Sequence, residues 1–226
     1  MSILSVARRA CFLATYHAYA RAKLGRTDRV RMLGFRLVVP PQVFHPGLSI
    51  SSKTMGKYVL KLPLDRKHVL DMGCGSGILS LIAASAGAFV TAVDINPIAV
   101  SSARENARRN NLYNRIRFLD GNLFGSLFDE QFDYILFNPP FYLGKPHNVR
   151  DMAWRGGADY GVIRDFIADA SRFLKRDARI VMILSSDMRI DQVLEIFRAH
   201  AFSVGRVWVK RFLFETFSIY EGFRGS

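Results

Sequence analysis

The sequence predicts an α/β fold: a seven-stranded, mainly parallel sheet with helices on both faces and an antiparallel strand pair at its C-terminal end. Two observations lead to this prediction. From residue 67 onward, short apolar runs that are typical of buried strands alternate with segments of helical periodicity. The last two strand-like runs follow each other without an intervening helix, which is typical of an antiparallel hairpin. Sheets of this kind bind ligands at the carboxyl ends of their parallel strands.

The expected strands share short runs of Val, Ile, Leu and Phe, with polar residues or turn residues between them. They cover residues 67–72, 89–95, 116–120, 132–138, 178–185, 202–210 and 214–223. The expected helices repeat apolar residues every three or four positions. They cover residues 77–88, 97–111, 161–175 and 190–200. Gly87 closes the first of these helices, and Pro97 lies in the first turn of the second, where a missing N–H costs no helical hydrogen bond.

Residues 1–42 are expected to form a basic N-terminal helical extension, and residues 43–226 the main domain. In residues 1–23 small and apolar side chains recur at helical spacing, and the segment runs directly into more positive charge, unlike a secretory signal. The Pro-rich stretch 38–47 predicts the joint. A helix packed on the domain with a solvated basic side is the first interpretation. Contact with nucleic acid is the second, and binding to a membrane surface the third.

The composition indicates which cellular compartment and which kinds of partner to expect. The chain has 32 Lys and Arg against 19 Asp and Glu, and this net charge of +13 favours a polyanionic or acidic partner. Cys11 and Cys74 offer neither a disulfide framework nor a CxxC motif, so we expect a reduced, cytoplasmic location. The five histidines lack the spacing of metal ligands, and no metal site is expected. No apolar run reaches the ~20 residues that a membrane span needs.

The turn after the first expected strand reads DMGCGSG, residues 71–77. Gly73 and Gly75 allow a tight turn and a close approach of the backbone to a ligand, while Gly77 begins a helix whose first amides can meet an anionic group. The GxGxG spacing differs from the GxGxxG of dinucleotide-binding turns, which would require glycine at Ile78. Asp71 would repel a pyrophosphate, but it suits a cationic amine.

Carboxylates also end the next two expected strands. Asp94 lies about 20 residues beyond the glycine turn, the position from which a carboxylate binds ribose hydroxyls. Asp120 ends the third strand and is followed by Gly121 and Asn122. Each aspartate alone is equally typical of a helix cap or a loop brace. Together with the GxGxG turn, the three carboxylates predict a pocket for adenosine and an ammonium group rather than for phosphates.

With these motifs, residues 43 to 223 resemble the class I S-adenosylmethionine-dependent methyltransferases. The resemblance implies a Rossmann-like domain with S-adenosyl-L-methionine as its cofactor. It implies that Asp94 holds the ribose and that Asp120 reaches the adenine amino group. It assigns the methionine part of the cofactor to Asp71, Gly73, Gly75 and Gly77.

The fourth expected strand ends in NPPF, residues 138–141. The Asn138 side-chain oxygen and the Pro139 carbonyl can accept both hydrogens of a planar amide or amino nitrogen, which favours localising its lone pair toward a methyl carbon. The two prolines fix φ and keep these acceptors rigid, and Phe141 can stack on the planar group. Because positioning supplies much of the acceleration, no strong general base is required. We therefore expect Asn138, Pro139, Pro140 and Phe141 to be catalytic, with Asn138 also at the cofactor. The plainer interpretation is a stiff loop with an Asn cap and a core Phe.

NPPF resembles the [DNS]PP[YFW] motif of methyltransferases that act on exocyclic amino groups of bases or on the glutamine amide of translation release factors. Residues 153–167, which include Trp154, and residues 212–223 resemble segments of the HemK-like glutamine methyltransferases. Residues 43–52 are similar to their cofactor-lid segment, with Phe44, Pro46 and Ser51 or Ser52 near the methionine end. That group usually has tyrosine where Phe141 stands, whereas phenylalanine is familiar among RNA base methyltransferases.

These features favour an N-methyltransferase with a macromolecular acceptor. A protein glutamine, as in a release factor, is the first choice, and an exocyclic amino group of an RNA or DNA base is the alternative, with the basic N-terminal segment as a nucleic-acid contact. A non-catalytic cofactor-binding or RNA-binding scaffold is a further alternative, and a dehydrogenase a third class. The modified position, the oligomeric state and the need for an activating partner stay open at this point.

Overall fold

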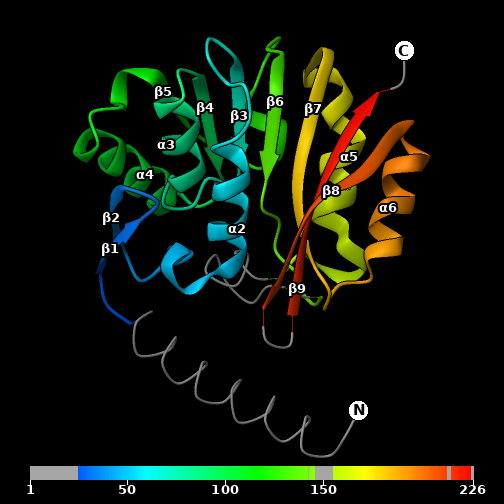
Figure 1. The fold of residues 1–226 in the computed structure, drawn as a ribbon, viewed down its shortest axis with the longest axis horizontal. Helices are drawn as coiled ribbons and strands as arrows, with labels where there is room; N and C mark the ends of the chain where they lie inside the picture. The colour runs from blue at the N-terminus through cyan, green and yellow to red at the C-terminus, as the bar shows by residue number, and fades with distance from the viewer. Residues whose placement is uncertain (1–24, 142, 146–154, 213–214, 225–226) are drawn as a thin grey trace, which may run out of the picture.

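The computed structural model describes residues 25–141, 143–145, 155–212 and 215–224. Seven strands form one sheet in the order β5-β4-β3-β6-β7-β9-β8 (Figure 1). These strands are β3 (His68–Met72), β4 (Phe89–Asp94), β5 (Ile116–Asp120), β6 (Phe132–Phe137), β7 (Leu174–Ser185), β8 (Phe202–Phe212) and β9 (Glu215–Arg224). Strands β3 to β7 pair in parallel, whereas β9 runs antiparallel between β7 and β8. The predicted sheet, including its antiparallel end, is confirmed.

Helices cover both faces of this sheet. One face carries α2 (Ile50–Val59), α3 (Ile78–Ser85) and α4 (Pro97–Arg109), and the other carries α5 (Gly161–Ala170) and α6 (Ile190–Ala199). Short 3-10 helices are η1 (Pro46–Leu48), η2 (Tyr113–Arg115), η3 (Leu123–Ser126), η5 (Ala158–Tyr160) and η6 (Ser171–Phe173). The four expected helices are confirmed, although each ends earlier than its apolar pattern. Helix α2 was not among the expected helices.

The two faces explain why the central strands are apolar at nearly every position. In β3, Val69 packs in the core on the side of α2 and α3, whereas Leu70 packs in the core on the side of α5 and α6, and neither is exposed. A strand that is buried on both sides has no polar face. Because β3, β4 and β6 run in the same direction, their carboxyl ends meet at one edge of the sheet, where polar residues follow.

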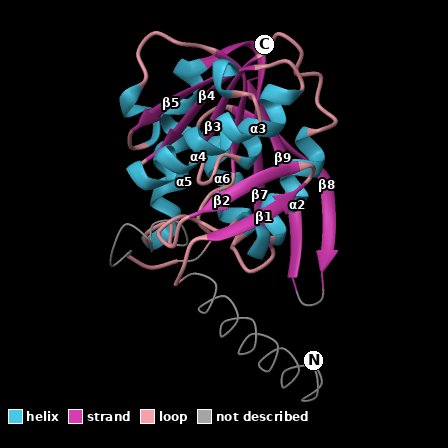
Figure 2. Cartoon of the chain, turned by 90° about the vertical axis from the view of Figure 1, so that its left-hand side faces the viewer, coloured by secondary structure: helices cyan, strands magenta, loops and turns pink. Residues whose placement is uncertain are grey.

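Residues 28–39 depart from the expected helical extension. They form an antiparallel hairpin of β1 (Asp28–Met32) and β2 (Phe35–Val39), which lies against α4 (Figure 2). The reason is a period of two: Met32, Leu37 and Val39 turn inward and are buried, and exposed arginines alternate with the inward residues. The helix predicted over residues 1–23 lies outside the described residues.

A buried asparagine fastens this hairpin to the domain. Asn106 of α4 accepts a hydrogen bond from the Val38 N–H at 2.8 Å and donates to the Val38 carbonyl at 3.1 Å. The same amide nitrogen donates to the carbonyl of Ser76, in the glycine turn after β3, at 3.0 Å. The hairpin and the turn are therefore held by one side chain.

Among the described helices, none is long and apolar enough to cross a membrane.

Candidate active site

A cavity opens at the carboxyl ends of β3, β4 and β6. Its walls come from the glycine turn after β3, the ends of β4 and β6, the turn after β5, and a segment that precedes α2 and includes Gln42 and Phe44. Most of the lining is apolar. Of the described residues that line it, Asp94 and Arg155 carry charge. The Arg155 guanidinium also donates to the Leu143 carbonyl at 3.4 Å.

The glycine turn has the shape of a cradle. Gly73 and Gly75 line the cavity with φ of +69° and +54°, a backbone region that glycine adopts without strain. Apart from the adjacent residues, a methyl group on either would meet its nearest protein atom at 3.8 Å or more, so a ligand can approach the backbone there. The N–H groups of Gly73 and Cys74 donate to the Val93 carbonyl at 2.8 and 2.9 Å. Because β4 already uses these amides, the turn does not offer them as an anion-binding nest.

Gly77 has a packing role in this structure. It is not among the residues that line the cavity, and its φ is +86°. A Cβ at Gly77 would lie 2.9 Å from the Cβ of Ala103 in α4. Gly77 therefore allows α3 to begin in close contact with α4.

Asp71 also lies behind the cavity wall instead of in it. Its side chain is 1% exposed, and one carboxylate oxygen accepts from the Ser80 N–H at 2.9 Å and from the Ser80 hydroxyl at 2.5 Å. Burial raises the pKa of this carboxyl from 3.8 to about 6, against the two hydrogen bonds, which lower it; repulsion from Asp94 adds to the rise. Asp71 thus braces the first turn of α3 beneath the glycines.

Asp94 faces the cavity. One carboxylate oxygen accepts from the Gly75 N–H at 2.8 Å and the other from the Asn96 N–H at 2.9 Å. Burial raises the pKa of Asp94, and these backbone hydrogen bonds oppose the rise. Each carboxylate oxygen has a second lone pair that can accept from a hydroxyl. The position fits the predicted ribose contact.

The turn after β5 places a different residue in the cavity from the one expected. Asp120 is exposed and is not part of the lining, whereas Gly121, Asn122 and Leu123 are. The Gly121 N–H donates to the Asp94 carbonyl at 3.0 Å, which continues the pairing of β5 with β4 one residue beyond Asp120, and the chain then enters η3 at Leu123. Asn122 was missed because a carboxylate at the strand end was the stronger sequence signal.

The NPPF loop closes the opposite end of the cavity, which all four of its residues line. The side-chain nitrogen of Asn138 donates to the Ser52 hydroxyl of α2 at 3.3 Å. This hydrogen bond fixes the orientation of the amide, whose carbonyl oxygen is the acceptor that the side chain offers to a ligand. Ser52 is 3% exposed and itself lines the cavity, so the amide is oriented from the cavity wall.

The loop is supported from two more sides. The ring of Phe141 lies 6.0 Å from that of Phe217 at the start of β9. A Cβ on Gly156 would lie 3.0 Å from the Pro140 carbonyl oxygen, so the glycine lets the segment before α5 press on the loop. The structure therefore brings together the predicted residues at Gly73, Gly75, Asp94 and 138–141, and leaves Asp71, Gly77 and Asp120 outside the lining. Trp154 lies outside the described residues.

The donor set fits S-adenosylmethionine better than a dinucleotide or a metal. The cavity offers a hydroxyl acceptor at Asp94 and apolar walls for a nucleoside, whereas the amides that would hold a pyrophosphate are used by β4. Within the described parts of the chain, no group of three His, Cys, Asp or Glu side chains could hold a metal ion.

Proteins of similar sequence include named methyltransferases. A protein of Methanocaldococcus jannaschii, named "Putative protein N5-glutamine methyltransferase", is 34% identical over 165 residues, which are 70% of this chain and 80% of that protein. The tRNA1(Val) (adenine(37)-N6)-methyltransferase of Glaesserella parasuis is 31% identical over 130 residues, 55% of this chain and 54% of that protein.

Among solved structures, a T. thermophilus 16S rRNA N2 G1207 methyltransferase in complex with AdoMet and guanosine superimposes with a TM-score of 0.67 at 22% identity. It covers 88% of this chain, which spans half of that one, and at this identity the likeness shows the fold alone. The family model described as methyltransferase small domain matches residues 41–206, which include the whole cavity lining. The chain therefore belongs to the methyltransferase small domain family.

Proposed function

We propose that this protein transfers a methyl group from S-adenosylmethionine to a planar nitrogen, and that the first candidate acceptor is the side-chain amide of a protein glutamine. The observation that carries the proposal is the orientation of Asn138 by Ser52 at one end of the cavity. The other end has Asp94 and apolar walls that suit a nucleoside. When bound, the cofactor supplies an electrophilic methyl carbon on a sulfonium.

In this proposal, the cavity residues that follow β4 and β5 hold the nucleoside part of the cofactor. Asp94 accepts from the ribose hydroxyls with the lone pairs that its backbone hydrogen bonds leave over. Asn122 takes the adenine edge in place of Asp120, since it is Asn122 that lines the cavity. Gly73 and Gly75 leave room for the methionine part next to the backbone.

The NPPF loop positions the acceptor. The Asn138 side-chain oxygen and the Pro139 carbonyl accept the two hydrogens of the acceptor nitrogen, so its lone pair faces the methyl carbon. The nitrogen would gain positive charge when it is methylated and lose it when one of its two hydrogens leaves as a proton to solvent. These two dipoles are already aimed at the nitrogen and would stabilise that charge. Phe141 supports the flat face of the acceptor group.

Two acceptors are consistent with this site. Glutamine is supported by the M. jannaschii relative, because 80% of that protein is covered at 34% identity. A base amino group is the second candidate, favoured by the net charge of +13, which suits a polyanionic substrate.

The proposal is tested with S-adenosylmethionine that carries a labelled methyl group, offered with total cell protein, total RNA and DNA in parallel. Mass spectrometry of hydrolysates then identifies methylglutamine or methylated nucleosides. Label in nucleosides alone would reject glutamine, and tight cofactor binding with no transfer to any pool would favour the scaffold alternative.

The role of Asn138 has its own test. Asn138→Ala is expected to lower kcat by about 10²- to 10³-fold, the usual effect of removing one preorganised hydrogen-bonding group. Ser52→Ala keeps the amide but releases its orientation, so a smaller loss, roughly tenfold, is expected. Asn114→Ala, at an exposed asparagine of η2, is the matched control. Calorimetry with the cofactor should show similar affinity in all three variants, and an unchanged kcat in Asn138→Ala would refute the assignment.

A further inference from the structure

We propose that the hairpin β1–β2 and the end of α4 form a docking face for the phosphate backbone of RNA. This proposal rests on the second candidate of the proposed function, in which the methyl acceptor is a base amino group of RNA. The face, called here the arginine face, consists of Arg29, Arg31, Arg36, Arg108 and Arg109.

Strand register places the hairpin arginines on one side. Arg31 pairs directly with Arg36, and Arg29 pairs with Val38, so these side chains project from the same face of the two-stranded sheet. The three arginines are exposed. The alternate residues of both strands face the domain, which leaves the arginine side turned to solvent.

This arrangement is unfavourable for the isolated protein. Like charges directly opposite each other on neighbouring strands destabilise a sheet. The acidic residue of the hairpin does not relieve the Arg31–Arg36 pair, because Asp28 lies in the inward set and its carboxylate is 3.1 Å from the ring of His45. The direct opposition of two like charges does not stabilise the hairpin, whereas a bound polyanion would neutralise both members.

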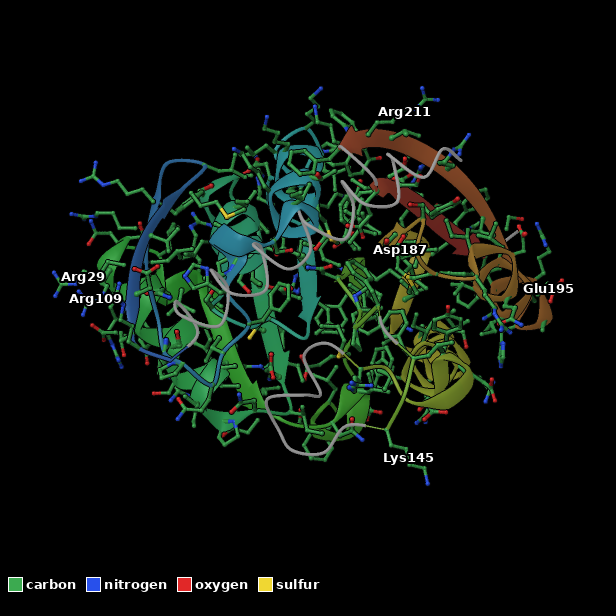
Figure 3. The ribbon with its side chains drawn as sticks, turned by 90° about the horizontal axis from the view of Figure 1, so that it is seen from below. Arg29, Arg109, Lys145, Asp187, Glu195 and Arg211 are labelled. Atoms are coloured by element: carbon green, nitrogen blue, oxygen red, sulfur yellow. The ribbon has the colours of Figure 1, made fainter. Side chains whose placement is uncertain are left out.

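The C-terminal end of α4 extends the same charge. The Arg36 guanidinium donates to the Arg109 carbonyl at 3.0 Å, so the hairpin and the helix end are in direct contact. Figure 3 shows Arg29 and Arg109 close together at one side of the molecule, far from Arg211 of β8. Glu105 lies 2.9 Å from Arg109 and 3.7 Å from Arg108, so one carboxylate is shared between two of the five cations.

The chemistry of the face suits nucleic acid. All five cations are arginines, whose planar forks match phosphate oxygens in pairs, which lysine cannot do. The Arg108 guanidinium lies 4.6 Å from the ring centre of Tyr113, which is 42% exposed. The ring of Phe118 also stacks on Tyr113, with ring centres 6.2 Å apart, so these aromatic contacts hold the Arg108 guanidinium in place at the surface.

The arginine face is also connected to the cavity. Strand β2 ends at Val39, and Gln42, three residues later, lines the cavity, with its carbonyl accepting from the Asn96 side chain at 2.9 Å. Three residues of extended chain span at most about 11 Å. Arg29, which pairs with Val38, is the member of the arginine face nearest to this rim, whereas Arg108 and Arg109 lie at the other end of α4 from the lining residue Ala99. RNA held along the face therefore reaches toward the cavity from the Arg29 end.

The test is the salt dependence of RNA binding by the full chain, measured from the anisotropy of a labelled single-stranded RNA of mixed sequence. Each phosphate contact contributes about −0.7 to the slope of log affinity against log salt for single strands. The triple variant R29A/R31A/R36A should therefore have a slope shallower by about 2 and weaker binding at every salt concentration. R29K/R31K/R36K should keep most of the slope, because it keeps the charge.

A matched control removes the same charge from another part of the molecule, at three exposed arginines of β7, α6 and β8: R176A/R198A/R206A. It should leave the slope within about half a unit of the parent. Equal losses in both triple variants, or a parent that does not bind RNA, would overturn the proposal. So would displacement of the RNA by polyglutamate at equal charge, since the face would then serve an acidic protein.

The readout separates this inference from the proposed function. None of the five arginines lines the cavity, so cofactor affinity by calorimetry should be unchanged in the triple variant. If RNA binding depends on the arginine face but no nucleoside is methylated, the base acceptor is wrong while the docking face stands. If nucleosides are methylated equally by the parent and the triple variant at limiting RNA, the face is wrong while the acceptor stands.

Discussion

Substituting Asp71 by Asn tests the claim that this carboxylate braces the glycine turn instead of binding the cofactor. Both hydrogen bonds from Ser80 go to the same carboxylate oxygen, so an asparagine carbonyl can accept them in the same place. The side chain is 1% exposed, and its pKa is raised to about 6 by burial. The substitution therefore removes a buried charge and retains the accepting atom.

The pKa difference sets the size and the sign of the effect. A rise from 3.8 to about 6 corresponds to roughly 3 kcal/mol. Between these two pH values the folded protein binds more protons than the unfolded chain, so the free energy of unfolding falls as pH rises through this window. The stability gained by Asp71→Asn should accordingly be small near pH 4 and larger by as much as about 3 kcal/mol at pH 7. Any cost of placing the new NH₂ group, on the order of 1–3 kcal/mol, is the same at both pH values.

Urea unfolding of the parent and of Asp71→Asn at several pH values between 4 and 7 measures this difference. A stability difference that does not change with pH would refute the raised pKa. Calorimetry with S-adenosylmethionine supplies the second readout: because Asp71 does not line the cavity, we expect an affinity within a few-fold of the parent. A large loss of affinity with normal stability would instead support the direct contact that the family resemblance implies.

Two glycines give further predictions. Gly77→Ala should lower the free energy of unfolding by about 2–4 kcal/mol, because the new Cβ combines a φ of +86° with a 2.9 Å contact to Ala103; a loss below about 1 kcal/mol in denaturant unfolding would contradict this packing role. Gly156→Ala should lower kcat roughly tenfold with cofactor affinity retained, because its Cβ would press on the Pro140 carbonyl at 3.0 Å and shift the NPPF loop. Gly161→Ala, where a Cβ meets nothing within 4 Å, is the control, and equal rates in both variants would show that the loop tolerates the pressure.

Sequence patterns located the parts of this protein that depend on neighbours in the chain. The strands β3, β4 and β6 follow from continuous apolar runs, and Asp94 and Asn138 follow from their places at strand ends. These features are local, because a parallel sheet fixes where the end of each strand must lie. The cavity between them could therefore be placed without a structure.

The remaining features depend on contacts between distant segments. Apolar and arginine side chains alternate in residues 28–39, which is the period of a strand. The high density of arginines led instead to the prediction of a basic helical extension. Gly77 fits a ligand-binding motif, and only its distance to Ala103 shows that it serves helix packing. Asn122 lines the cavity and Asp120 does not, which depends on how the chain passes from β5 into η3, and composition does not reveal that path.

The amide of Asn106 has a consequence for the order in which the molecule assembles. It bonds to Val38, 68 residues earlier in the chain, and to Ser76. We therefore expect the hairpin to be synthesised early but to dock late, since long-range contacts form after the local contacts that close the intervening chain. Two strands and two helices of the main domain lie in the sequence between the hairpin arginines and Asn106. Because one amide bonds to both segments, we expect the glycine turn to gain its hydrogen bond to α4 when the hairpin docks.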